Sequence, residues 1–271
     1  MTNPTAIAAI RAYVNAQRAG VTVAGAEPVF LPGERTAFLI LHGWAATPES
    51  VRFLIKGLSE GGHSILAPVL PGHGTNAAAL TLTGPLDWIG AAREALTLLS
   101  AAYGPIHVLG VSMGGALGIQ LAALEPTRVL SLTTLNAPVF MDSPQRALTL
   151  MAGPADELLD FWQGPLCLGP PVDEITYPQR SRKSGIDLFA MAGLAHAALP
   201  MIQAPVLILQ SVQDPVVAKA NADMILERAA SSSKRVEWLH NSLHASQLDL
   251  DRDAIVKFAL EFSSTPSPVR S

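Results

Sequence analysis

VLGVSMGGA, residues 108–116, is the stretch from which the fold of this chain is most readily predicted. The apolar run Ile106–Val111 is typical of a buried strand, and helix-forming residues, Ala116–Ala123, follow. Between strand and helix stands Gly-x-Ser-x-Gly, with Ser112 at its centre. This arrangement is the sequence form of a nucleophile elbow, a sharp turn that presents a serine at the carboxyl end of a central strand.

The glycines of this motif suit such a turn. Gly110 and Gly114 carry no Cβ that would clash where the strand and the helix approach each other. Ser112 would stand at a helix N-terminus, where the dipole and the unpaired N–H groups favour developing negative charge. We therefore predict that Ser112 is a catalytic nucleophile. An ordinary structural turn is the alternative, because glycine and serine are common residues.

Length and composition favour a globular α/β domain. The chain has 271 residues, of which 49% are hydrophobic and 15% are charged, which allows a well-buried core and argues against a disordered chain. Its 18 Lys and Arg residues against 22 Asp and Glu residues give a net charge of −4. This charge offers no electrostatic basis for binding nucleic acid.

Cysteine and histidine usage predicts neither a disulfide nor a metal site. Cys167 is the one cysteine of the sequence, so an intrachain disulfide is excluded. The histidines are scattered and lack metal-ligand spacing. We therefore expect no metal ion and no cofactor.

No stretch of the sequence is a convincing membrane span or signal peptide. The longest candidate span, residues 190–212, contains Pro200 and Pro205 and is better explained as a helix followed by a core strand. The apolar run at residues 6–10 is stopped by Arg11 and follows no basic region. We expect a cytoplasmic protein without an integral membrane segment, and its oligomeric state is not predicted.

Strand-like and helix-like stretches alternate along most of the chain. This alternation predicts a mostly parallel central sheet with helices on both faces. We assign residues 35–136 and 201–262 to this α/β core and residues 1–34 to an N-terminal extension of a helix and a strand. Residues 263–271, rich in Ser and Pro, are predicted to be a flexible tail.

Residues 137–200 interrupt the alternation with many prolines and short helical pieces. They stand between two predicted strands of the sheet, so they would lie over its carboxyl edge. We predict a helical lid insertion whose apolar residues line an acyl-binding pocket and help to exclude water. An ordinary cluster of surface helices is the alternative.

A second strand ends in a motif that can serve the same site. Ala37–Leu41 is a continuous apolar run, typical of a strand buried on both faces, and HGW (residues 42–44) follows it. A backbone N–H at this turn could stabilise an acyl oxyanion, and Gly43 lets the chain turn closely enough. We expect His42 to be a buried, hydrogen-bonded residue rather than a proton carrier. His73, which stands between two glycines, is likewise expected to shape its loop.

Two further strand-like runs are followed by candidate catalytic residues. Asp214 follows the run Pro205–Ser211, and His244 lies in the loop after Val236–Leu239. Together with Ser112 they give the order nucleophile, acid, base, each beyond the end of a strand. His244 would accept the proton of the attacking serine. Asp214 would orient the imidazole and stabilise the imidazolium.

Each of these two residues has an alternative. Asp214 could cap the helix that follows it. His240 is the rival base, four residues before His244. It stands at the end of the predicted strand, whereas His244 lies in the loop, so we prefer His244.

Taken together, these motifs resemble those of the α/β-hydrolases, in particular the bacterial carboxylesterases and monoacylglycerol lipases. The chain departs from that group at Trp44, where Phe is usual, and at Leu243, where a glycine often precedes the histidine. The resemblance covers residues 35–262 and rests on LHGW (41–44), LPGHGT (70–75), GVSMGG (110–115), QDPVV (213–217) and NSLH (241–244).

The resemblance implies an α/β-hydrolase fold with a helical cap and a serine esterase for short- to medium-chain acyl esters, monoacylglycerols included. Its partner would be a small-molecule ester with an apolar acyl chain. The resemblance also implies an oxyanion hole formed by the backbone N–H groups of Trp44 and Met113. The same triad could instead serve a thioesterase, an acyltransferase, an amidase or a carbon–carbon bond hydrolase, and a catalytically silent binding protein is a further alternative.

Overall fold

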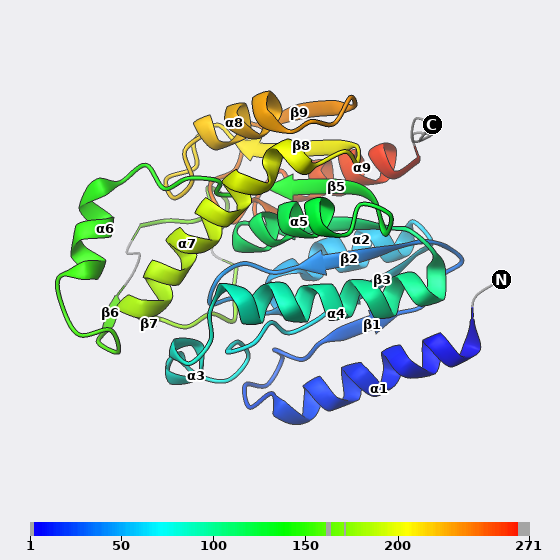
Figure 1. Cartoon of the computed structure of the whole chain (residues 1–271), viewed down its shortest axis with the longest axis horizontal. Coiled ribbons are helices and arrows are strands. Elements are labelled where there is room, and N and C mark those ends of the chain that lie inside the picture. Colours follow the sequence, from blue (N-terminus) through cyan, green and yellow to red (C-terminus); the bar gives the residue numbers. More distant parts are fainter. Residues whose placement is uncertain (1–2, 161–163, 171, 265–271) are drawn as a thin grey trace.

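The computed structural model describes residues 3–160, 164–170 and 172–264. The strands of its central sheet are β1 (Val29–Leu31), β2 (Arg35–Leu41), β3 (His63–Ala67), β4 (Ile106–Val111), β5 (Val129–Leu135), β8 (Val206–Ser211) and β9 (Lys234–Leu239). They form a seven-stranded sheet in the order β1-β3-β2-β4-β5-β8-β9 (Figure 1). β1 pairs antiparallel with β3 and all other pairs are parallel, which confirms the predicted, mostly parallel sheet.

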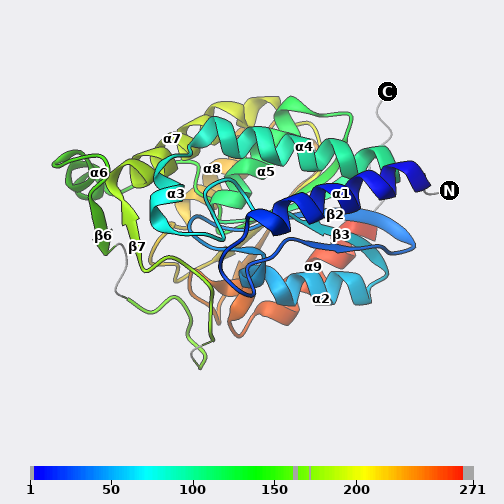
Figure 2. The same cartoon turned by 90° about the horizontal axis from the view of Figure 1, so that it is seen from below.

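Helices cover both faces of this sheet, as predicted. They are α1 (Pro4–Gly20), α2 (Arg52–Glu60), α3 (Ala77–Thr81), α4 (Pro85–Tyr103), α5 (Met113–Leu124), α6 (Pro144–Met151), α7 (Arg182–Ala198), α8 (Ala220–Arg228) and α9 (Arg252–Ser264). α2 and α9 pack on one face, and α4, α5 and α8 on the other (Figure 2). Alternate residues of β2 serve the two faces: Leu39 and Leu41 join one core cluster, Phe38 and Ile40 the other.

The segment 1–34 contributes α1 and β1. Asn3 caps α1, since its side chain accepts hydrogen bonds from the first N–H groups of the helix. Ile10 and Val14 are buried on the face of α1 that packs against α4. Gln17 then joins α1 to the core: its side chain donates to Val69 O and accepts from Val69 N. This extension is therefore tied to the loop that follows β3.

Residues 137–200, predicted to be a lid, run from β5 to β8. Besides α6 and α7 they contain a two-stranded antiparallel ribbon, β6 (Leu158–Asp160) and β7 (Gln179–Ser181). α6 and the ribbon stand together at one end of the molecule in both views (Figures 1 and 2). The ribbon was not predicted, because strands of three residues are too short for a readable alternation. The role of the segment as a lid stays a prediction.

One helical stretch, Arg182–Met201, is long and apolar enough by length and composition to cross a membrane. In this fold its residues Met191 and Ala195 are buried in the core cluster, and α7 packs against α5. Core helices pass the same test of length and composition, so the stretch is weak evidence for a membrane span. Of the predicted tail, residues 263 and 264 end α9, and residues 265–271 lie outside the described part of the chain.

Candidate active site

Ser112 lies at the turn from β4 into α5, with φ 52° and ψ −119°. A non-glycine residue in such a conformation costs about 1–3 kcal/mol and persists only where its surroundings impose it. Here a Cβ on Gly110 would overlap the backbone of Gly114, and a Cβ on Gly114 would overlap that of Leu41. The predicted sharp turn is therefore present, and the close packing of strand and helix imposes it.

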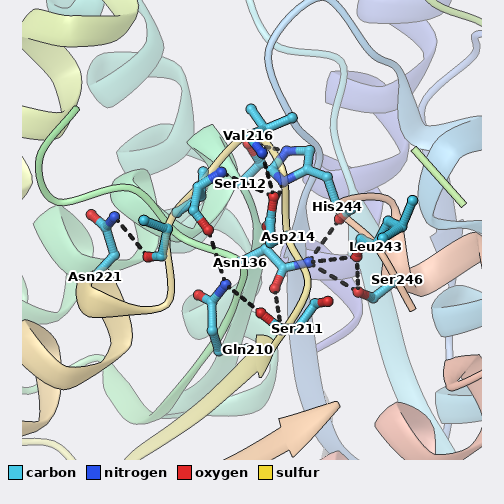
Figure 3. Close-up of polar contacts among 12 residues, drawn as sticks. Ser112, Asn136, Gln210, Ser211, Asp214, Val216, Asn221, Leu243, His244 and Ser246 are labelled. Carbon is cyan, nitrogen blue, oxygen red and sulfur yellow. Dashed lines mark hydrogen bonds and ion pairs between the residues drawn. The ribbon is translucent and has the colours of Figure 1, made fainter. Parts of the chain in front are cut away.

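The side chains of Ser112, His244 and Asp214 form a chain of contacts (Figure 3). His244 Nε2 lies 3.1 Å from Ser112 Oγ, and His244 Nδ1 lies 2.8 Å from Asp214 Oδ2. The Asp214 side chain is fully buried, whereas that of His244 is 14% exposed. In a neutral ring the nitrogen that faces the carboxylate carries the proton, which leaves Nε2 to accept the serine hydroxyl.

Asp214 uses its two oxygens for different contacts. Oδ1 accepts hydrogen bonds from Val216 N at 2.8 Å and from Val217 N at 2.9 Å, while Oδ2 faces His244. The bonds to Oδ1 close a local turn and do not cap α8, whose N-cap residue is Lys219. The turn thus holds the carboxylate so that its second oxygen points at the imidazole.

The loop that carries His244 is held by Asn136, which sequence reasoning missed. Asn136 is fully buried just after β5. Its Nδ2 donates to His244 O at 2.7 Å and to Ser246 Oγ at 3.0 Å, and its Oδ1 accepts from Ser211 N at 2.8 Å (Figure 3). A polar residue directly after a buried strand was the one available signal. Asn136 links the ends of β5 and β8 to the histidine loop.

His240 is the alternative candidate for the general base, and its surroundings differ from those of His244. His240 is exposed at the end of β9, and its carbonyl accepts a hydrogen bond from Gln213 Nε2 at 3.1 Å. The imidazole placed against Asp214 is that of His244.

Leu243, which stands where a glycine is often found, has no positive φ, and its N–H donates to Asp249 Oδ2 at 3.0 Å. A glycine is therefore not needed at that position.

The turn after β2 lies beside the elbow. A Cβ on Gly43 would stand 3.5 Å from Ser112 Cβ, at ordinary contact distance. The Gly43 carbonyl accepts hydrogen bonds from His42 Nδ1 at 2.9 Å and from Ala46 N at 3.3 Å. Because the C=O and N–H of a trans peptide point in opposite directions, these bonds also set the direction of Trp44 N–H.

Two buried histidines brace this turn. His42 Nε2 accepts from Leu70 N at 3.1 Å, and His73 Nε2 accepts from Ala45 N at 3.0 Å. Burial lowers the pKa of His42 to about 3 and that of His73 to about 4, so both rings are neutral near pH 7. These contacts are those of loop-shaping residues, as we predicted for both histidines.

A cavity of about 140 Å³ opens beside Ser112 and His244. Its walls come from the core and from residues 137–200, and most of its surface is apolar. The lining residues are Gly43, Trp44, Ala46, Ser50, Val111, Ser112, Met141, Arg146, Leu166, Glu174, Thr176, Arg180, Leu188, Phe189, Val216, His244, Ala245 and Gln247.

The described part of the cavity wall carries three charged residues, Arg146, Glu174 and Arg180, and none of them was predicted. Burial raises the pKa of the Glu174 carboxyl, and His244 acts in the opposite direction. Burial lowers the pKa of the Arg180 guanidinium. Its Nη2 donates to Thr176 Oγ1 at 3.1 Å, and its Cζ lies 5.2 Å from the centroid of the Trp44 ring, at cation–π distance. Glu174 lies in an irregular stretch and Arg180 in the three-residue strand β7, and neither shows a periodicity that marks its environment.

Among the side chains that the structure describes, no group of three or more His, Cys, Asp or Glu residues is placed to hold a metal ion. The chemistry of the site lies in its hydroxyl, imidazole and carboxylate. Such a set can activate a serine as a nucleophile, because the ring accepts the hydroxyl proton and the carboxylate stabilises the resulting imidazolium.

Comparisons with known proteins agree with this fold. The Alpha/beta hydrolase family matches residues 38–257. A thermostable monoacylglycerol lipase from a Bacillus species is 32% identical over 240 residues, which cover 89% of this chain and 95% of that enzyme. A carboxylesterase from Bacillus subtilis is 26% identical over 239 residues, covering 87% and 95% of the two chains. A solved structure described with the metagenome-derived lipolytic enzymes LipS and LipT has a TM-score of 0.84 at 32% identity, covering 89% and 98%.

The chain therefore belongs to the α/β hydrolase family. Within that family it is an enzyme of the lipase and esterase type, similar to bacterial monoacylglycerol lipases and carboxylesterases. The resemblance noted in the sequence is thereby confirmed.

Proposed function

We propose that the protein hydrolyses carboxylic esters of short- to medium-chain acyl groups through an acyl-enzyme, and that monoacylglycerols are among its substrates. Ser112 is the nucleophile, His244 the general base and acid, and Asp214 the residue that orients the imidazole. The observation that carries the proposal is the unbroken chain of contacts from Ser112 Oγ through His244 to the buried Asp214 carboxylate, at the wall of an apolar cavity.

The reaction has two halves. In the first, Ser112 Oγ attacks the ester carbonyl carbon while His244 Nε2 takes the hydroxyl proton; the tetrahedral oxyanion then collapses, and the alcohol leaves with the proton from His244. In the second, His244 deprotonates a water molecule that attacks the acyl-enzyme, and the carboxylic acid departs as Ser112 regains its proton. Asp214 stays ionised throughout and stabilises the imidazolium in both halves.

The oxyanion is proposed to bind the N–H groups of Trp44 and Met113. Met113 is the first residue of α5, where N–H groups point toward the elbow and the helix dipole favours negative charge. The Trp44 N–H lies in the peptide whose carbonyl is held by His42 and Ala46. Each such donor is worth about 2.7–4 kcal/mol of transition-state stabilisation.

The composition of the cavity supports the substrate class. Apolar residues such as Leu188 and Phe189, from the proposed lid, would contact the acyl chain. Glu174, Arg180 and Thr176 add polar groups to the same wall, which suits an alcohol portion that carries hydroxyl groups. The relative with 32% identity is named a monoacylglycerol lipase, in agreement with an ester of this kind.

The test is a series of initial rates with p-nitrophenyl esters from acetate to palmitate and with a medium-chain monoacylglycerol. We expect a maximum at short or medium chains. Ser112→Ala should lower kcat at least about a thousandfold without unfolding the protein. Ser100→Ala is the matched control, because Ser100 lies on α4 and its hydroxyl donates to a nearby carbonyl, Thr97 O, at 3.2 Å.

Two results would overturn the proposal. One is a Ser112→Ala protein that hydrolyses esters at the wild-type rate. The other is a folded wild-type protein that hydrolyses none of these esters. In the second case thioester and amide probes would be tried with the same pair of variants, because one scaffold of this family hosts several acyl-transfer chemistries.

A further inference from the structure

Residues 173–180 of the insertion lie against the turn that follows β2, where the proposed oxyanion hole is formed. Tyr177 N–H donates to Ala45 O at 3.1 Å, and Ile175 N–H donates to Glu49 Oε2 at 3.2 Å. These bonds join backbone of the insertion to the core at the edge of the cavity. The insertion is therefore attached to this turn by directional contacts as well as by packing.

The side chain of Tyr177 makes a second connection. It is 7% exposed and reaches the loop between β3 and α3. Its hydroxyl donates to Gly72 O at 2.9 Å and accepts from Thr75 N at 2.8 Å. Two of its partners are backbone groups, and the third, Thr75 Oγ1 at 3.3 Å, belongs to the same loop, so the phenol holds the course of that loop.

That loop in turn carries His73, which accepts a hydrogen bond from Ala45 N at 3.0 Å. Ala45 has φ 59°, a left-handed conformation that a non-glycine residue keeps only where its surroundings impose it. Its N–H is held by His73 and its carbonyl by Tyr177 N–H. Tyr177 thus acts on Ala45 directly through its backbone and indirectly through its hydroxyl and the loop of His73.

We propose that Tyr177 is a positioning residue for the oxyanion hole, which couples the position of the insertion to the orientation of the turn that carries Trp44 N–H. The inference rests on the function proposed above. A shift of residues 173–180 would tilt the turn, and this would weaken the binding of the transition state more than that of the substrate. The difference arises because preorganised donors are aimed at the position that the oxyanion takes and not at the ground-state carbonyl oxygen.

Tyr177→Phe tests this inference, because it removes the hydroxyl and leaves the backbone bond to Ala45. We expect kcat for p-nitrophenyl butyrate to fall about tenfold, less than the hundred- to thousandfold loss that a missing oxyanion donor causes. The inhibition constant of an alkyl trifluoromethyl ketone should rise by the same factor, since its adduct with Ser112 Oγ places an oxyanion in the hole. The inhibition constant of a 1-O-alkylglycerol ether, which binds without forming an oxyanion, should change by less than about twofold.

Tyr103→Phe is the matched control, since Tyr103 is a partly buried tyrosine at the end of α4 and does not line the cavity. It should behave as the wild type. All kinetics are measured well below the melting temperature of each protein. If Tyr177→Phe is not recovered folded, p-aminophenylalanine at position 177 and the wild type are compared instead. Its amino group can still donate to Gly72 O but is a weak acceptor for Thr75 N–H. We therefore expect a smaller loss, again by the same factor in kcat and in affinity for the ketone.

Three outcomes would overturn the inference: an unchanged kcat in Tyr177→Phe, an equal loss of affinity for the ketone and the ether, or the same kinetic loss in Tyr103→Phe. Failure of the proposed function is distinguishable from these, because it appears in the wild type and in Ser112→Ala. A wild-type enzyme that hydrolyses esters only when Ser112 is intact, together with an unchanged Tyr177→Phe, would refute the positioning role alone.

Discussion

Asn136→Ala is the substitution for which the structure predicts the most specific result. The buried amide of Asn136 donates to His244 O at 2.7 Å and accepts from Ser211 N at 2.8 Å, and its φ is 49°. Alanine would leave the buried Ser211 N–H and the partly buried His244 carbonyl without this partner, at about 1–3 kcal/mol each. Keeping alanine in a left-handed conformation adds about 1–2 kcal/mol. We expect the free energy of unfolding to fall by about 4 kcal/mol.

The same substitution should impair the proposed catalysis, because the lost hydrogen bond holds the carbonyl of the proposed base. A displacement of about 1 Å in a catalytic group can cost about a hundredfold in rate. We therefore expect kcat for p-nitrophenyl butyrate to fall between about 10- and 100-fold, with KM changed by less than about threefold. Stability is measured by urea unfolding followed through tryptophan fluorescence, and kinetics are measured in buffer at a temperature at which the variant is folded.

Asn221→Ala is the control for loss of a buried amide. Asn221 is 1% exposed, and its Oδ1 accepts from Val139 N at 2.8 Å and from Phe140 N at 3.0 Å. Its removal should cost about 2–4 kcal/mol of stability and leave kcat close to that of the wild type. If both variants lost the same fraction of kcat, or if Asn136→Ala kept full activity, the link between Asn136 and His244 would be refuted.

Two further predictions concern stability. Burial lowers the pKa of His42 to about 3 and those of His73 and His107 to about 4, whereas an unfolded histidine titrates near about 6.5. Below about pH 6.5 the unfolded chain therefore binds more protons than the folded chain. The contribution of the neutral rings to the free energy of unfolding is complete above that pH and falls as the pH drops toward about 4. The loss reaches up to about 2 kcal/mol per histidine at pH 5. Urea unfolding midpoints measured from pH 7.5 to 5 follow this decline, which should be shallower in His107→Asn than in the wild type. If the midpoint fell equally steeply with pH in both proteins, the contribution assigned to His107 would be contradicted. Gly110→Ala would place a Cβ inside the backbone of α5 and should cost at least about 3 kcal/mol, whereas Gly90→Ala, with open space on the exposed side of α4, should add about 1 kcal/mol. Melting temperatures compare the two, and a Gly110→Ala protein as stable as Gly90→Ala would contradict the packing of the elbow.

Local patterns predicted most of the fold. Nearly continuous apolar runs indicated β2, β4 and β8, because a strand buried on both faces carries apolar side chains toward both of them. The alternation of strands with helices then predicted a parallel sheet, since parallel neighbours require crossover connections. The ribbon of β6 and β7 was missed, because its pairing depends on residues about twenty positions apart rather than on a local repeat.

The candidate site was predicted in part. Ser112, Asp214 and His244 each follow a predicted strand, and the carboxyl ends of parallel strands meet at one edge of a sheet. The structure brings the three side chains into contact, and their catalytic roles stay a prediction. Glu174 and Arg180 were not foreseen, because they reach the cavity from an irregular stretch and from the three-residue strand β7, neither of which shows a local repeat.

By itself, the sequence determined the alternation of strands and helices in the core, the elbow at Ser112 and the candidates for its partners. These features follow from steric and periodic preferences of neighbouring residues. Only the tertiary structure decided which loops meet above the elbow. Asn136 bonds the carbonyl of a residue 108 positions away, and Tyr177 bonds Gly72 at a separation of 105 positions. Each of these bonds joins a side chain to a backbone carbonyl far away in the sequence. The distance between the two depends on the packing of the whole sheet and its helices, and no local pattern encodes it.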